Sequence, residues 1–236
     1  MPKGPIYTTR LESVVSLSEW TKHFRFRLID PSKMEFKAGQ FMLVFAEKDG
    51  KRIQRPYSIA SSPEHTDFFE LCLNRVPDGF MSNHLCDLSE GETVQVQGPF
   101  GVFTLKEPQG RASAFVATGT GIAPFRSMIR WLLVGGTKQE LWLFFGVRYE
   151  TDVLYHAEWG ELARRHPNFH YVPTVSRPQS WTGYAGYVQH HLPKYLKDPS
   201  GLNVYICGLG QMVADVQQAL LGMGLAKEQV HFERYD

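Results

Sequence analysis

Residues 55–58 read Arg-Pro-Tyr-Ser and place a fixed positive charge, an aromatic ring and a hydroxyl group within four positions. A guanidinium group binds phosphate through parallel hydrogen bonds, and an aromatic side chain stacks against a flat ring. The stretch therefore predicts a site for a ligand that is both anionic and planar.

Two glycine-rich turns have the residues to hold a second anionic ligand. Gly119 and Gly121 stand between an apolar strand pattern and a helix pattern, and Cys207 and Gly208 stand in the same position later in the chain. The N–H groups at the start of a helix favour phosphate. We expect a nucleotide site here, although residue 124 is proline and the Gly-x-Gly-x-x-Gly pattern is not met. An ordinary tight turn and a buried structural cysteine are the alternatives.

Polar residues follow two further strand patterns in the second half of the chain: Arg148, Ser176 and Arg177. The carboxyl ends of parallel strands meet at one edge of a sheet, so we expect the two guanidinium groups to lie close together. There they suit the 2′-phosphate of NADP, and solvated surface arginines are the alternative. Glu150 and Asp152 are near enough in sequence to bind a ribose diol, so NAD is also compatible.

The first hundred residues predict an antiparallel β-barrel or sandwich, because short apolar segments alternate with turns. The expected strands are 12–17, 23–29, 41–47, 57–62, 68–76 and 93–105, with a short helix at 81–88. The phenylalanines of these strands are expected in the barrel core. The conclusion is an antiparallel β-barrel domain at residues 1–106.

The remaining residues predict a doubly wound parallel sheet, because strands and helices alternate. The expected strands are 113–119, 140–148, 169–176, 202–208 and 229–235, and the expected helices are 123–136, 151–167, 184–196 and 212–224. A polar linker at about 106–110 separates this α/β domain, residues 111–236, from the barrel.

Composition narrows the possible functions. The chain has 236 residues and a formal net charge of +1, which gives no argument for nucleic acid or a membrane surface as partner. It has neither a membrane span nor the apolar core of a signal peptide, so we expect a cytoplasmic protein. Its three cysteines cannot supply the four thiolates of an iron–sulfur cluster, and no metal site is expected. Any redox centre must therefore be organic.

The order of a barrel, Arg-Pro-Tyr-Ser, Thr-Gly-Thr-Gly-Ile-Ala-Pro at 118–124 and Cys-Gly-Leu-Gly-Gln-Met at 207–212 resembles the ferredoxin–NADP⁺ reductase superfamily over nearly the whole chain. The resemblance implies FAD bound by the barrel and NADP (or NAD) bound by the α/β domain. It implies Arg55 at the flavin pyrophosphate, Tyr57 on the flavin ring and Ser58 near the atom that receives hydride.

The same resemblance implies further site residues. For FAD these are Pro56, Leu73, Asn74, a phosphate loop at Gly79, Phe80, Met81 and Ser82, and Thr120, which also touches nicotinamide. For the nucleotide they are Gly119, Gly121, Arg148, Ser176, Arg177, Cys207, Gly208 and Met212. The residues that the resemblance implies in catalysis are Ser58, Cys207, Glu233 and Tyr235.

Three features depart from the pattern of NADPH-using bacterial relatives. Tyr184 stands where those relatives often place a basic residue, and Trp181-Thr182-Gly183 is shared with NADH-using oxygenase reductases. Asp236 follows Tyr235, which leaves the position of a flavin-covering terminal ring open.

The implied activity is a flavoenzyme that transfers hydride between NAD(P)H and FAD, and single electrons between FAD and a ferredoxin or flavodoxin. Such acceptors are acidic, so candidate docking residues are the basic Lys51, Arg52, Arg75 and Arg126, with solubilising surface charges as the alternative. One alternative function is the NADH-dependent reductase component of an oxygenase system. Another is a non-enzymatic, FAD-binding electron-transfer subunit of a larger complex. A monomer is expected.

Overall fold

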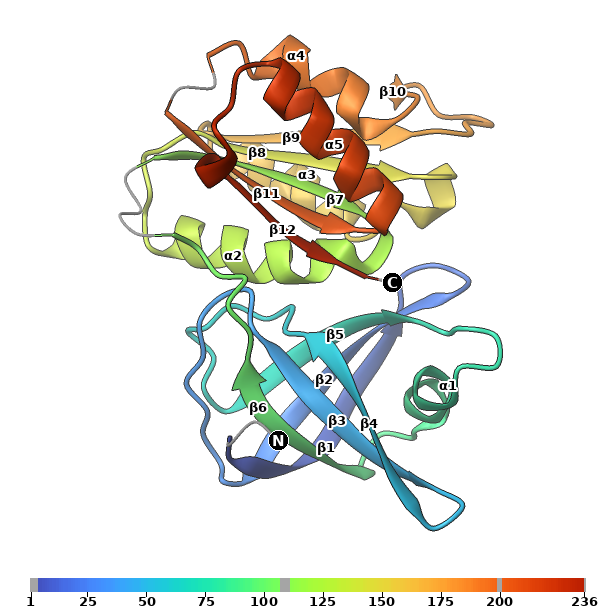
Figure 1. The fold of residues 1–236 in the computed structure, drawn as a ribbon. Helices are drawn as coiled ribbons and strands as arrows, with labels where there is room; N and C mark the ends of the chain where they lie inside the picture. Colours follow the sequence, from blue (N-terminus) through green and yellow to red (C-terminus); the bar gives the residue numbers. More distant parts are fainter. Residues whose placement is uncertain (1–3, 107–110, 199–200, 236) are drawn as a thin grey trace. The chain divides into compact units, whose positions relative to one another are not determined.

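The protein is described by a computed structural model that covers residues 4–106, 111–198 and 201–235 (Figure 1). The chain divides into two compact units. The first comprises Met1–Leu105 and Ala123–Trp131, and the second comprises Lys106–Ile122 and Leu132–Asp236. Residues 107–110 of the predicted linker lie outside the described residues, so the domain limits of 106 and 111 stay predictions.

The first unit is built on six antiparallel strands in the spatial order β4-β3-β6-β1-β2-β5. Its elements are β1 (Ile6–Ser16), β2 (Thr21–Asp30), β3 (Phe41–Lys48), β4 (Lys51–Ser58), β5 (Phe68–Asn74), α1 (Phe80–Asp87) and β6 (Thr93–Phe100). A bridge between Ile59 and Leu71 joins the two edges of the sheet and closes it into a barrel. Alternate residues such as Phe24 and Phe26 are buried in the barrel core, as the period of two in a strand requires.

Strand β4 differs from the sequence expectation, which placed a strand at 57–62. The observed strand begins at Lys51 and forms a hairpin with β3, turning at Asp49 and Gly50, which both have positive φ. Most side chains from Lys51 to Pro56 are exposed, so the segment lacks the apolar alternation that marks a half-buried strand. The charged side chains of the hairpin therefore lie in solvent, outside the barrel core.

The second unit is a parallel sheet with the order β10-β9-β8-β7-β11-β12 (Figure 1). Its elements are β7 (Ala112–Thr118), η1 (Gly119–Gly121), α2 (Ile122–Val134), β8 (Leu141–Val147), η2 (Glu150–Asp152), α3 (His156–Arg165), β9 (Phe169–Val175), β10 (Tyr184–Ala185), η3 (Val188–His191), α4 (Leu192–Tyr195), β11 (Leu202–Gly208), α5 (Gly210–Gly222), η4 (Lys227–Gln229) and β12 (Val230–Arg234). The order of the strands reverses between β7 and β11, and such a switch point is where open α/β sheets bind ligands. The two-domain fold class is confirmed.

One predicted helix is wrong. Residues 184–196 were expected to form a single helix, but they form β10, η3 and α4. Gly186 has a φ of 97° and interrupts the helical path after two residues of strand. The short strand β10 adds a sixth strand at the edge of the sheet beside β9.

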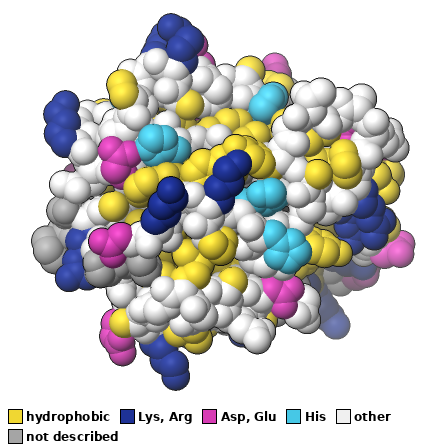
Figure 2. All heavy atoms as spheres, turned by 90° about the horizontal axis from the view of Figure 1, so that it is seen from above, with side chains coloured by type: hydrophobic (Ala, Val, Ile, Leu, Met, Phe, Trp, Pro, Cys, Tyr) yellow, Lys and Arg dark blue, Asp and Glu magenta, His cyan; other side chains and the backbone are white. Residues whose placement is uncertain are grey.

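Charge is dispersed on the face shown in Figure 2, where lysine and arginine side chains lie apart from one another among hydrophobic and other side chains. Among the residues that the structure describes, no helix is both long enough and apolar enough to cross a bilayer.

Candidate functional site

The β3–β4 hairpin of the first unit gathers positive charge on one face. Lys51, Arg55 and Tyr57 point to the same side of β4 because they are separated by even numbers of residues. Lys48 pairs with Lys51 across the hairpin and joins this face. Its ammonium group lies 5.4 Å from the centre of the Phe80 ring, at the start of α1. The three cations, here called the hairpin cations (Lys48, Lys51 and Arg55), therefore face the beginning of α1.

None of the hairpin cations pairs with a carboxylate within residues 4–106, 111–198 and 201–235, and all three are exposed. Tyr57 is half-buried against the barrel core, and burial raises its pKa to about 12, so its hydroxyl stays protonated. Ser58 is 7% exposed at the end of β4. The sequence identified Arg55 but not Lys48, whose position follows only from the register of the hairpin.

The start of α1 offers backbone N–H groups to an anion. Phe80, Met81 and Ser82 form its first turn, where N–H groups have no partner within the helix, and this turn contains no acidic residue. The Ser82 hydroxyl bonds within the turn, donating to the Gly79 carbonyl at 3.0 Å and accepting from the Val76 N–H at 3.1 Å. A Cβ at Gly79 would lie 2.7 Å from that hydroxyl oxygen, so the turn requires glycine.

Leu73 and Asn74 lie at the end of β5, the strand that meets the β4 side at the barrel closure. Leu73 is buried, and the Asn74 side-chain oxygen accepts a hydrogen bond of 2.6 Å from the Thr21 hydroxyl. The predicted FAD residues other than Thr120 thus all lie in the first unit, on β4, β5 and the start of α1. Thr120 lies in η1 of the second unit.

The two glycine-rich turns of the second unit touch each other where β7 and β11 end side by side. A Cβ at Gly121 would lie 2.3 Å from the Cys207 carbonyl oxygen. A Cβ at Gly208 would lie 2.3 Å from the Thr118 hydroxyl oxygen and 2.6 Å from the end of the Met212 side chain. Gly121 is therefore required by the close approach of the Cys207 backbone, and Gly208 by its φ of 152° and its contact with the Thr118 side chain, so the two turns pack against each other.

Two buried hydroxyl groups at this sheet edge have no hydrogen-bond partner among the described atoms: those of Thr118 and Thr174. Strand register places them on either side of Gly146, at the ends of β7, β8 and β9. Buried polar groups are nearly always satisfied, so such groups indicate a missing ligand or water. The sequence did not single out these two threonines, because nothing in the strand patterns distinguishes them from other strand residues.

Cys207, Glu233 and Tyr235 are brought together by the pairing of β11 with β12. Cys207 stands opposite Glu233, and the Tyr235 N–H donates to the Gly208 carbonyl at 3.0 Å. Burial raises the pKa of the Cys207 thiol, and the neighbouring Glu233 raises it further, against a hydrogen bond with Tyr235. Burial also raises the pKa of Glu233. Both pKa values therefore lie above their ordinary values.

Arg148, Ser176 and Arg177 lie on two adjacent segments that follow β8 and β9. The Ser176 N–H donates to the Val147 carbonyl at 2.9 Å, and the Arg177 N–H donates to the Arg148 carbonyl at 2.8 Å. Both arginines are exposed, and neither pairs with a carboxylate in the described part of the chain. The backbone thus holds two uncompensated cations next to each other.

Arg126 is not a surface docking residue, which corrects the sequence expectation. The residue is 6% exposed. It donates to the Glu70 carboxylate at 2.7 Å and to the Ala60 carbonyl at 3.0 Å. The residue lies on the segment of α2 that groups with the barrel unit. Of the other expected docking residues, Arg75 pairs with Asp87, whereas Lys51 and Arg52 are exposed.

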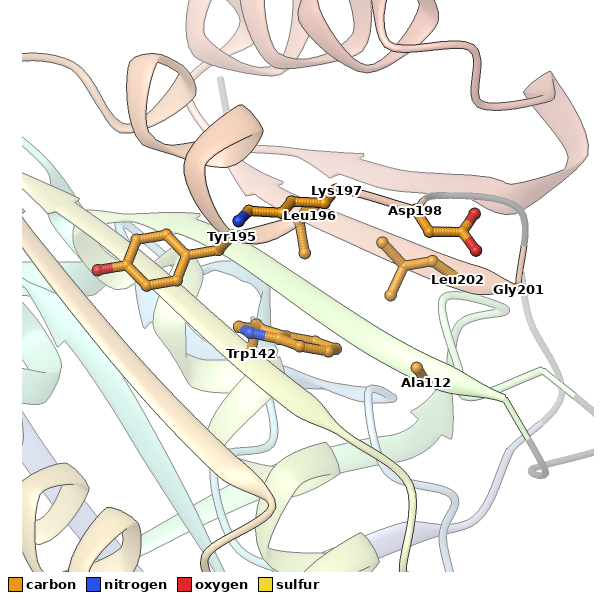
Figure 3. Close-up of a pocket in the computed structure, with 8 residues that line it drawn as sticks. All are labelled: Ala112, Trp142, Tyr195, Leu196, Lys197, Asp198, Gly201 and Leu202. Carbon is orange, nitrogen blue, oxygen red and sulfur yellow. The ribbon is translucent and has the colours of Figure 1, made fainter.

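Figure 3 shows a pocket of about 380 Å³ in the second unit. It is lined by Ala112, Trp142, Tyr195, Leu196, Lys197, Asp198, Gly201 and Leu202. Ala112 begins β7 and Leu202 begins β11, so the pocket lies at the opposite edge of the sheet from the glycine-rich turns. Within the described residues, no group of three or more His, Cys, Asp or Glu side chains is placed to hold a metal ion.

Comparison with known proteins identifies both units. Residues 8–105 match the oxidoreductase FAD-binding domain and residues 115–218 match the oxidoreductase NAD-binding domain. The chain is 38% identical over 238 residues to ferredoxin–NADP reductase B of Sorangium cellulosum, covering 98% of each chain. It is 29% identical to the phenol hydroxylase P5 protein of Acinetobacter pittii, covering 97% of this chain but 65% of that longer one.

A solved structure of a ferredoxin NADP⁺ reductase from Neisseria gonorrhoeae, with bound FAD and NADP, has the same fold. The TM-score is 0.86 at 24% identity, and the match covers 98% of this chain and 99% of that one. This chain belongs to the ferredoxin–NADP⁺ reductase superfamily. It is an oxidoreductase with an FAD-binding domain and a nicotinamide-nucleotide-binding domain, as the sequence motifs predict.

Proposed function

We propose that this protein is a ferredoxin or flavodoxin–NADP⁺ reductase that works with FAD. The observation that carries the proposal is the 38% identity to ferredoxin–NADP reductase B of Sorangium cellulosum along 98% of both chains. When bound, FAD supplies the redox chemistry, since it exchanges hydride with NAD(P)H and single electrons with a protein acceptor.

The residues of the first unit fit FAD. Arg55 and the other hairpin cations carry unpaired positive charge, and the start of α1 presents N–H groups without a neighbouring acid. A pyrophosphate needs these donors. Tyr57 offers a ring held against the barrel core for the flavin to lie on, and Ser58 offers a hydroxyl one residue further along β4.

The residues of the second unit fit a phosphorylated nucleotide. No described atom beyond the neighbouring residues lies within 4 Å of a Cβ built on Gly119, so this turn lets a pyrophosphate approach the backbone, whereas Gly121 and Gly208 let the two turns pack against each other. Arg148 and Arg177, with the neighbouring Ser176, would bind a 2′-phosphate. We therefore expect NADPH to be preferred over NADH.

Cys207, Glu233 and Tyr235 form the proton-holding part of the site. Burial raises the pKa of the thiol and that of the carboxyl, so the thiol keeps its proton near neutral pH. We expect Cys207 to face the nicotinamide as a neutral thiol, and the Glu233 carboxyl to exchange a proton with the site.

The test is spectroscopic and kinetic. Purified protein should show the absorption bands of bound FAD, and NADPH should bleach them faster than NADH. Reduced protein should then transfer electrons singly to a ferredoxin or flavodoxin. Arg55→Ala should lose flavin, and Arg164→Ala is the control because its guanidinium pairs with Glu161 on α3. A protein that remains colourless in excess FAD would overturn the proposal.

A second candidate function is the reductase component of an oxygenase system. It is favoured by the phenol hydroxylase P5 protein and by the glycine betaine monooxygenase reductase subunit of Pseudomonas aeruginosa, which is 30% identical. This chain spans only 65% and 64% of those two proteins. A preference for NADH, together with electron transfer to an oxygenase but not to a ferredoxin, would favour this function.

A further inference from the structure

The loop that follows β9 is tied to the segment that follows β8 by a ladder of hydrogen bonds. The first two rungs are backbone bonds, from Ser176 and Arg177 to the carbonyl groups of Val147 and Arg148. The next residue, Pro178, has no N–H group to donate. The backbone ladder therefore stops directly after the residue that carries the second cation.

Glu150 continues the ladder with its side chain. Its carboxylate accepts the Gln179 N–H at 3.3 Å to each oxygen, and it accepts the Ser180 hydroxyl at 2.9 Å as well as the Ser180 N–H. These bonds stabilise the charged form, and they lower the pKa of Glu150 to about 2. The carboxylate thus stays ionised at any physiological pH and holds the loop from one side.

Trp181 holds the other end of the loop. Its indole N–H donates to the Tyr184 carbonyl at 3.1 Å, and its ring lies 5.7 Å from that of His156 on α3. A Cβ at Gly183 would lie 2.6 Å from the indole nitrogen, so a glycine is needed for this contact. The loop is therefore fixed at both ends, with Arg177 at its start.

The hydrogen bonds to the loop determine which other groups the Glu150 carboxylate can bind. The carboxylate stands two residues after Arg148, yet it pairs with neither Arg148 nor Arg177 and bonds backbone N–H groups instead. Both guanidinium groups are left with uncompensated charge, which suits a dianion. Oε1 accepts three of these bonds, whereas Oε2 accepts only the shared Gln179 N–H, so Oε2 is the atom left to accept a hydrogen bond from a ribose hydroxyl group.

We propose that Glu150 is a positioning residue that sets the preference for a 2′-phosphorylated nucleotide, by fixing the 177–181 loop and leaving Arg148 and Arg177 unneutralised. The inference rests on the proposed function, in which these arginines bind the 2′-phosphate. The competing role is direct binding of the ribose diol of NADH by Glu150, and the experiment separates the two.

The experiment compares Glu150→Ala and Glu150→Gln with Glu161→Gln, a glutamate on α3 that pairs with Arg164 and Arg165. The probes are 2′,5′-ADP and 5′-AMP, measured by calorimetry on the holoprotein. We expect Glu150→Ala to raise the Kd for 2′,5′-ADP about tenfold, which corresponds to the loss of one or two hydrogen bonds to the charged phosphate. The Kd for 5′-AMP should stay within about twofold of the parent's. Glu150→Gln keeps one acceptor oxygen and should fall between, and the control should match the parent.

Hydrogen exchange supplies a readout that does not depend on nucleotide binding. The amides of Gln179 and Ser180 should exchange at least about tenfold faster in Glu150→Ala than in the parent. Unchanged exchange there would overturn the positioning role. A larger loss of NADH or 5′-AMP binding than of 2′,5′-ADP binding would show that Glu150 binds the ribose instead.

Arg177→Ala distinguishes failure of this inference from failure of the proposed function. If Arg177→Ala leaves 2′,5′-ADP binding unchanged, the phosphate assignment is wrong and the inference falls with it. If Arg177→Ala abolishes the selectivity while Glu150→Ala does not alter it, only the role of Glu150 is wrong.

Discussion

In the first unit the Glu70 carboxylate is bound by arginine side chains, whereas in the second unit the Glu150 carboxylate is bound by backbone N–H groups although Arg148 stands two residues away. Glu70 is 4% exposed and accepts from Arg25 at 2.7 Å and from Arg126 at 2.7 Å, with His23 at 3.5 Å. Both of these arginines thus have a carboxylate partner, whereas Arg148 and Arg177, near Glu150, have none in the described part of the chain.

Burial explains the difference. A carboxylate removed from water must be compensated by charge as well as hydrogen bonds, so the Glu70 cluster is closed and structural. A carboxylate at the surface needs only well-placed donors, and the loop after β9 supplies them. Glutamate and arginine therefore pair with each other in the barrel, around Glu70. In the sheet, backbone N–H groups occupy Glu150, and the nearby arginines stay available to an anion.

The largest expected effect is a loss of stability on removing the Glu70 carboxylate from its buried cluster. Glu70→Ala leaves Arg126 buried without its carboxylate, and removing one member of a buried ion pair costs about 3–5 kcal/mol. Urea denaturation of the holoprotein should show this loss, whereas Glu150→Ala, at an exposed site, should lower the unfolding midpoint much less. An equal effect of the two substitutions would contradict the contrast between the clusters.

The same cluster predicts an acid-labile fold. Burial opposes ionisation of Glu70, but the hydrogen bond from His23 and the charge of Arg126 outweigh it, so the pKa of Glu70 is lower in the folded protein than its ordinary value of 4.5. The stability it contributes is therefore present above about pH 4.5 and lost as pH falls through the folded value. Glu70→Ala should flatten the acid limb of stability measured against pH.

The open site is tested by removing one of its cations. Arg177→Ala should raise the KM for NADPH roughly tenfold to a hundredfold, the cost of losing a hydrogen bond to a charged phosphate, with kcat and the KM for NADH little changed. Arg164→Ala, on α3, is the matched control. Equal losses for both nucleotides would contradict the 2′-phosphate assignment.

These two clusters also show how far the sequence reaches. Arg148 and Arg177 could be predicted as neighbours, because both follow strand patterns and parallel strands end at one edge. Arg126 was misjudged because a lone arginine in a helix pattern is usually solvated, and its partner Glu70 lies 56 residues away in the chain on β5. Pairing across such distances depends on how α2 meets the barrel, which no local pattern encodes.

The β3–β4 hairpin carries a similar lesson. Its apolar half, 41–47, was recognised from its composition, whereas no strand was predicted for the polar half, 51–56, that carries Arg55. Only the backbone pairing shows that Lys51 faces the start of α1 while Arg52, its neighbour, lies on the opposite face with its guanidinium 3.6 Å from the centre of the Phe45 ring. The Arg-Pro-Tyr-Ser motif identified the anion site from the sequence. The register of the β3–β4 hairpin determines which other side chains lie on the same face.

That register makes a smaller and sharper prediction for FAD. Lys51→Gln should weaken FAD binding to the apoprotein roughly two- to fivefold, the usual worth of one exposed ion pair, and higher salt should reduce the difference. Arg52→Gln, one residue along but on the other face, should bind FAD like the parent. Fluorescence titration with FAD measures both. Loss of affinity in Arg52→Gln alone would show that the wrong face of the hairpin was assigned.

The smallest expected effect concerns Glu233, which is partly buried and has no paired cation among the described residues. Burial raises its pKa, in contrast to that of Glu70. The folded state therefore favours the protonated carboxyl, and the stability this group contributes falls as pH rises above the unfolded value of about 4.5. Glu233→Gln removes this dependence, so its stability relative to the parent should rise slightly between pH 4 and pH 8. A relative stability that falls over that range would mean that a cation stabilises the Glu233 carboxylate, as Arg126 stabilises that of Glu70.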